Sequence, residues 1–75
     1  GASANFNDKG LFMLFEVRDQ NNGTFYRINS DQIVYFYKEP NIMGVMTYFI
    51  VMSNNLKIAL PAKRWRRIQY LLTKQ

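Results

Sequence analysis

Short runs rich in apolar, aromatic and β-branched residues, separated by polar turns, occupy residues 11–60 of this 75-residue chain and predict β-strands. From Leu11 to Arg18 the odd positions are all apolar up to Val17, while the even positions change from apolar to charged. Gly23 ends a polar segment suited to a hairpin turn, and residues 29–32 form a second polar break that fits one helical turn. The same reading gives five predicted strands, over residues 11–18, 24–29, 33–38, 45–52 and 56–60.

The fourth predicted strand, Val45 to Met52, is apolar on both faces, which is typical of a strand that is central or covered on both sides. Three methionines, Met43, Met46 and Met52, lie in and around it. Methionine fills gaps in cores and also occurs at adaptable interaction surfaces, so both interpretations stay open.

The last segment predicts one helix, from Ala62 to about Thr73, because Pro61 ends the preceding strand and suits a helix start. At 100° per residue, Trp65, Ile68 and Leu72 share one face. The opposite arc carries Lys63, Arg66, Arg67, Tyr70 and Lys74. The predicted fold is therefore mainly β (α+β): a five-stranded antiparallel bent sheet or small barrel with one C-terminal amphipathic helix. Residues 11–75 form this domain, and residues 1–10 are expected to be a flexible lead-in.

Charge is sorted along the chain. All five acidic residues lie in the first 39 positions, whereas residues 57–75 carry six basic residues and no acidic one. Residues 1–56 sum to −1 and residues 57–75 to +6, which together give the net charge of +5. A field of one sign at one end indicates where an anionic partner would dock.

Composition argues against several classes of protein. Without histidine or cysteine, and with scattered carboxylates, the chain is not expected to be an enzyme, to hold a metal or to need a cofactor. The apolar run from Ile42 to Met52 is too short for a membrane span, which needs about 20 residues. No signal peptide is visible, so cytoplasmic residence (or the host cytoplasm or nucleoid) is the expected location.

The basic helix together with the sheet aromatics favours a non-catalytic nucleic-acid-binding module, either a single-strand binder or a small transcription regulator. Single-stranded DNA or RNA is the favoured partner, because bases stack on aromatic side chains while cations neutralise phosphates. The predicted binding residues are Lys57, Lys63, Arg64, Arg66, Arg67, Tyr70, Lys74, Tyr35 and Tyr37. Two other interpretations of the basic arc stay open: a solvated helix face, and a site for an acidic protein or membrane surface.

The apolar sheet also predicts a homo-oligomer, because one helix covers only one face of a sheet. The alternative function is a protein–protein interaction module or assembly component, a phage-encoded one included, that uses the apolar sheet face.

Two segments resemble known families. The run from Gly23 to Ile33 (GTFYRINSDQI), followed by a hairpin and a helix, resembles small bacterial FlbD-like proteins and, more distantly, the LytTR DNA-binding domain. The segment from Lys57 to Ile68 (KIALPAKRWRRI) is similar to the end of single-stranded-DNA-binding transcription coactivators. The second resemblance implies a dimer formed through the helix, with the sheet gripping single strands.

Overall fold

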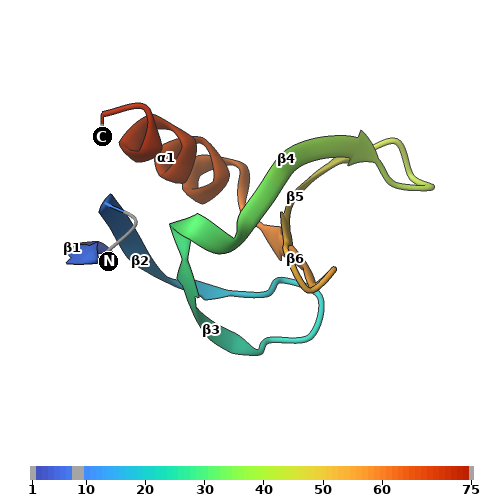
Figure 1. Ribbon diagram of the computed structural model, residues 1–75. Helices are drawn as coiled ribbons and strands as arrows, with labels where there is room; N and C mark the ends of the chain where they lie inside the picture. Colours follow the sequence, from blue (N-terminus) through green and yellow to red (C-terminus); the bar gives the residue numbers. More distant parts are fainter. Residues whose placement is uncertain (1, 8–9, 75) are drawn as a thin grey trace.

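The computed structural model describes residues 2–7 and 10–74, which form six strands and one α-helix (Figure 1). The strands make two antiparallel sheets of three strands each, in the orders β1-β2-β3 and β4-β5-β6. We call them sheet A and sheet B. The elements are β1 (Ala2–Asn7), β2 (Gly10–Arg18), β3 (Phe25–Asn29), the 3-10 helix η1 (Ser30–Gln32), β4 (Ile33–Pro40), β5 (Met46–Met52), β6 (Lys57–Leu60) and α1 (Ala62–Leu72).

The five predicted strands and the C-terminal helix are all present, so the mainly β, antiparallel fold class is confirmed. Of the two predicted forms, the barrel is wrong, because the sheet does not close. The chain instead breaks between β3 and β4 at η1, where Asn29 Oδ1 accepts a hydrogen bond from the Asp31 N–H. This turn redirects the chain from sheet A into sheet B.

Residues 2–7 of the segment expected to be a flexible lead-in form a strand, β1. β1 pairs along its whole length with β2, from Ala2 opposite Phe15 to Asn7 opposite Gly10. Residues 1, 8 and 9 lie outside the described residues. Apart from Phe6 the strand consists of small or polar residues, so propensity gives little sign of it, and the pairing depends on the backbone edge that β2 offers.

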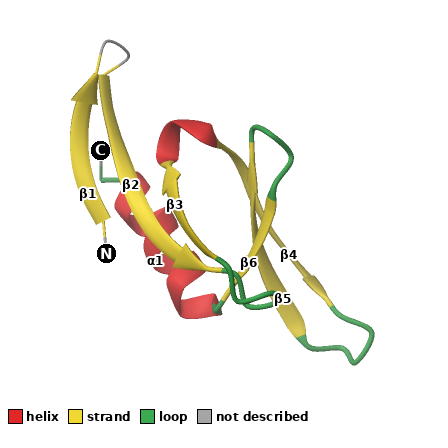
Figure 2. Ribbon diagram, turned by 90° about the horizontal axis from the view of Figure 1, so that it is seen from below, coloured by secondary structure: helices red, strands yellow, loops and turns green. Residues whose placement is uncertain are grey.

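The prediction that the fourth strand is central is confirmed in sheet B, where β5 has β4 on one side and β6 on the other. β4 extends two residues beyond its expected end, to Pro40, which pairs with Met46. The β4–β5 hairpin therefore projects well beyond the rest of the molecule, as Figure 2 shows. The protein is elongated as a result, measuring 44 × 22 × 20 Å.

One core joins both sheets and the helix. Phe15, Val17 and Ile28 come from sheet A, and Ile68 comes from α1. From sheet B, the cross-strand set Phe36, Ile50 and Ile58 lies on the inner face, together with Met52 and Leu60. Ile50, Ile58 and Ile68 are completely buried. Burial of each such side chain stabilises the fold by about 1.5–3 kcal/mol.

The helix lies as its periodicity predicts. Ile68 is buried, and Trp65, Leu71 and Leu72 are half-buried against the core. Pro61 occupies the N-cap position, and its carbonyl accepts the first helical hydrogen bond from the Trp65 N–H at 3.0 Å. Thr73 closes the other end, where its hydroxyl donates to the Tyr70 carbonyl at 2.7 Å.

Candidate nucleic-acid interface

The outer side of α1 is a surface of cations around one tyrosine. Core packing of Ile68 and Trp65 turns the opposite side of the helix to solvent. The predicted residues on that side are all exposed, and we call this set the helix surface: Lys63, Arg66, Arg67, Tyr70 and Lys74. No acidic residue follows Glu39 in the sequence, so α1 itself has no carboxylate to neutralise these charges.

Tyr70 is held between two cations. The Arg67 guanidinium lies 5.5 Å from the centre of its ring and the Lys74 ammonium 5.0 Å from it. The side chain is nevertheless 51% exposed. An exposed aromatic ring flanked by positive charges is the arrangement that binds a base and its phosphates together.

Arg66 extends the helix surface onto sheet B. Its guanidinium lies 5.4 Å from the Tyr48 ring centre and donates a hydrogen bond to the Tyr48 hydroxyl at 3.4 Å. Lys38 pairs with Tyr48 across the strands, so it shares that face of the sheet and is exposed. Sequence reasoning missed Tyr48 and Lys38 as members of this region. Their position on predicted strands gave no signal, because only the helix packing brings Arg66 to Tyr48.

The predicted sheet residues form a second, separate group. Tyr35, Tyr37 and Lys57, which we call the sheet surface, lie on the outer face of sheet B. Tyr37 stacks on the buried Phe49, with ring centres 4.9 Å apart, and Tyr35 lies 5.7 Å from Tyr37. The Lys57 ammonium lies 4.6 Å from the Phe49 ring centre. These contacts cover the face of Phe49, whereas Tyr35 stays exposed.

The pKa of Lys57 is raised above its ordinary value of 10.5. The main cause is a hydrogen bond with the Tyr37 hydroxyl, which favours the charged ammonium, and the Glu39 carboxylate acts in the same direction. Lys57 therefore keeps its positive charge throughout the physiological range, above the aromatic rings it covers.

The structure does not bring all predicted residues together. Trp65 packs on the inner face of sheet B, beside Phe36 and Tyr48. Tyr35 and Tyr37 alternate to the other face, since successive side chains of a strand point to opposite sides. The helix surface and the sheet surface thus lie on opposite sides of sheet B, and a short ligand cannot contact both.

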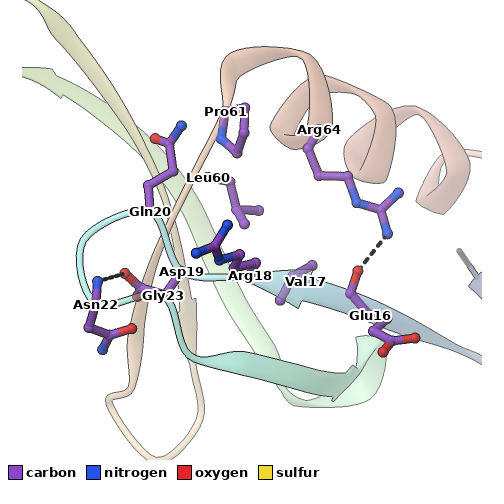
Figure 3. A pocket seen from close by; sticks show the side chains of 10 residues that line it. All are labelled: Glu16, Val17, Arg18, Asp19, Gln20, Asn22, Gly23, Leu60, Pro61 and Arg64. Atoms are coloured by element: carbon purple, nitrogen blue, oxygen red, sulfur yellow. Dashed lines mark hydrogen bonds between the residues drawn. The ribbon is translucent and has the colours of Figure 1, made fainter.

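Arg64 also departs from the other helix cations. It is half-buried, its Nη2 donates to the Glu16 carbonyl at 3.0 Å, and its guanidinium lies 6.0 Å from the Phe15 ring centre. Figure 3 shows it turned toward sheet A, where it lines an open pocket with Arg18 and Asp19. Arg64 thus ties α1 to β2, apart from the helix surface.

Asp19 organises the loop beside that pocket. Asp19 is 4% exposed, and its carboxylate accepts hydrogen bonds from the N–H groups of Asn21, Asn22 and Ala59. The Gln20 N–H donates to the Ala59 carbonyl at 2.9 Å. The loop after β2 therefore occupies the outer edge of β6, which makes Asp19 a structural residue.

Comparison with known proteins finds no family model, no curated protein and no solved structure that matches the chain. The resemblances to FlbD-like proteins, to LytTR domains and to the transcription coactivators therefore stay predictions. Within residues 2–7 and 10–74, no helix has the length and apolar character that crossing a membrane requires.

Proposed function

We propose that the protein is a non-catalytic module that binds single-stranded nucleic acid through the helix surface. The observation that carries the proposal is the exposed Tyr70 between Arg67 and Lys74. About half of Tyr70 is exposed to solvent, and stacking of a base on such a ring is worth about 1–3 kcal/mol. The flanking cations would then contact the phosphates on either side of the stacked base.

The size and charge of the helix surface support the same ligand. Lys63 and Lys74 are separated by about 16 Å along the helix, at 1.5 Å per residue, so the surface can follow several nucleotides. Lys63, Arg66 and Arg67 repel one another without a neighbouring carboxylate, and a phosphate backbone removes that repulsion while it releases counterions. Arg66 and Tyr48 continue the same chemistry onto the sheet.

The decisive experiment compares two variants with equal net charge. Lys63→Gln/Arg67→Gln removes two cations from the helix surface, and Arg18→Gln/Arg27→Gln removes two from sheet A. Binding of a fluorescent oligonucleotide is measured by anisotropy over a salt series. The helix variant is expected to lower the slope of log K against log salt by about 1.4, at roughly 0.7 per phosphate contact on a single strand.

The control variant should leave that slope unchanged. Equal losses in both variants would show that net charge alone attracts the ligand, and no loss in the helix variant would show that the basic arc is only a solvated face. Tyr70→Ala separates stacking from charge: affinity for single strands should fall roughly 5- to 150-fold with an unchanged slope, because stacking releases no counterion.

The exposed apolar end of the β4–β5 hairpin favours a second candidate, a protein-interaction or assembly module. Ile42 is 103% exposed and Met43 is 81% exposed. Such side chains are costly to leave in water and have no use in nucleic-acid binding through α1.

A further inference from the structure

The end of the β4–β5 hairpin presents apolar side chains on a well-ordered turn. The Asn41 side-chain oxygen accepts hydrogen bonds from the N–H groups of Met43 and Val45, and the Asn41 carbonyl accepts one from Gly44. Gly44 has φ +82°, a conformation that glycine adopts without strain. The exposed residues are held outward by this turn, and we call them the hairpin tip: Ile42, Met43, Val45 and Met46.

The strand leading to the hairpin tip has an unpaired edge. β4 is an edge strand of sheet B, and its described neighbours pair with it only on the β5 side. The Asn41 N–H donates to the Val45 carbonyl, and bonded positions alternate along an antiparallel ladder. Tyr37 and Glu39 therefore bond to β5, while the peptide groups of Phe36 and Lys38 point to the open edge.

We propose that this edge and the hairpin tip bind a second copy of the chain, with the two β4 strands antiparallel about a two-fold axis at Tyr37. In this register Phe36 of each copy lies opposite Lys38 of the other, so their outward peptide groups hydrogen-bond to each other. The two Lys38 side chains do not face each other, as they would if the axis lay at Lys38.

In that register the apolar residues along the edge of one copy meet apolar residues of the other copy. Val34, which is 61% exposed, lies at the start of β4, and the hairpin tip lies beyond its end. Antiparallel pairing brings the tip of each copy alongside Val34 of the other, which is the reciprocal contact that a two-fold interface requires.

The available area suits a dimer. From their exposed fractions, the side chains of the hairpin tip with Val34 and Tyr35 offer roughly 700 Å², against about 800 Å² per partner in a standard stable interface. The backbone edge of β4 contributes further area. The same edge and hairpin tip on a second copy therefore provide enough area for a stable interface, and no other surface is needed.

The assembly should stop at two copies. In the dimer the open edges of both β4 strands are paired with each other, so neither can bind a third copy. The far edge of the same sheet is already occupied, because Asp19 and Gln20 hydrogen-bond to Ala59 of β6. Pro40 has no N–H to donate at the open edge, so the paired segment ends before the hairpin turn.

Sedimentation velocity up to about 100 μM tests the proposal, and the wild-type chain is expected to dimerise within that range. Ile42→Asn/Met43→Asn removes the two most exposed apolar side chains and should weaken the dimer roughly 30-fold or more. Phe25→Asn is the matched control, because Phe25 is a 70% exposed apolar residue on sheet A. It should leave the dimer unchanged.

Two further variants test the edge pairing itself. Lys38→Pro removes an N–H that points away from β5, so the chain should fold as a monomer. If Lys38→Pro does not fold, Tyr37→Cys replaces it: the natural chain has no cysteine, so oxidation can form a disulfide only between copies. A wild-type monomer at all concentrations would overturn the proposal. So would a tip variant as dimeric as wild type, or a folded Lys38→Pro variant that still dimerises.

Discussion

Removal of the Trp65 indole is expected to destabilise the protein more than any other single change in α1 except at Ile68. The indole joins the helix to sheet B in two ways. Its ring contacts Phe36 and Tyr48, with ring centres 6.2 Å and 5.0 Å away. Its Nε1–H donates a hydrogen bond to the Phe49 carbonyl at 2.9 Å. Both contacts are lost in Trp65→Ala.

The expected loss of unfolding free energy follows from the partial burial of Trp65. Substitution of a buried tryptophan by alanine costs about 3–5 kcal/mol, and Trp65 is half-buried, so about 3 kcal/mol is expected. Trp65→Phe keeps most of the ring but loses the Nε1–H hydrogen bond to the Phe49 carbonyl, which costs about 1 kcal/mol. A domain of this size has a total stability near the lower end of the usual range, about 5 kcal/mol, so Trp65→Ala should be only marginally folded.

Urea unfolding followed by far-ultraviolet circular dichroism measures both variants, because neither retains the tryptophan for fluorescence. For Trp65→Phe, the melting temperature should fall by about 4–8 °C. Arg67→Ala, on the exposed side of the same helix, is the control and should change stability by less than about 0.5 kcal/mol. If Trp65→Ala unfolds at the wild-type urea concentration, α1 is not held to sheet B through this side chain, and the orientation of the helix surface loses its basis.

Three other changes have definite expected outcomes. Asp19→Ala leaves the N–H groups of Asn21, Asn22 and Ala59 without their acceptor and should lower the free energy of unfolding by about 2–3 kcal/mol, measured in urea. Gly44→Ala should cost about 1–2 kcal/mol from its positive φ alone, because no atom lies within 4 Å of an added Cβ; a larger loss would contradict this reasoning. Lys57 should titrate above the ordinary lysine pKa of 10.5 in an NMR titration, and its interaction with Tyr37 should be present below pH 10.5 and lost as the pH rises through the raised pKa. The rise in the pKa of Lys57 should become smaller in Tyr37→Phe, which removes the hydroxyl.

The strands and the helix could be predicted because each carries a strong local pattern. Residues of β2 alternate, β5 is apolar on both faces as a central strand requires, and Trp65, Ile68 and Leu72 recur at helical spacing. Their boundaries differ from the prediction by one or two residues. β4 runs on to Pro40 because the missing N–H of proline faces the open edge, where no ladder bond is required.

Two features could not be predicted for physical reasons. Five of the six residues of β1 are Ala, Ser or Asn, which give little strand signal, and its strand structure comes from pairing with the backbone of β2. The division of the candidate site depends on which face of sheet B receives α1. Alternation shows that Tyr35 and Tyr37 share a face, but nothing local to the sequence shows that Trp65 packs on the other one.

The division of the site has a consequence if the proposed dimer forms. Antiparallel pairing of the two β4 strands keeps both outer faces of sheet B on the same side, so Tyr35, Tyr37 and Lys57 of the two copies would make one continuous surface. The two helix surfaces would lie on the opposite side. Ligand binding to the helix surface should then be independent of protein concentration, whereas stacking on the sheet tyrosines should strengthen as the dimer forms. The Ile42→Asn/Met43→Asn variant separates the two: if it is monomeric and binds single strands like wild type, the helix surface is the binding site, and if it loses binding, the ligand needs the joined sheets.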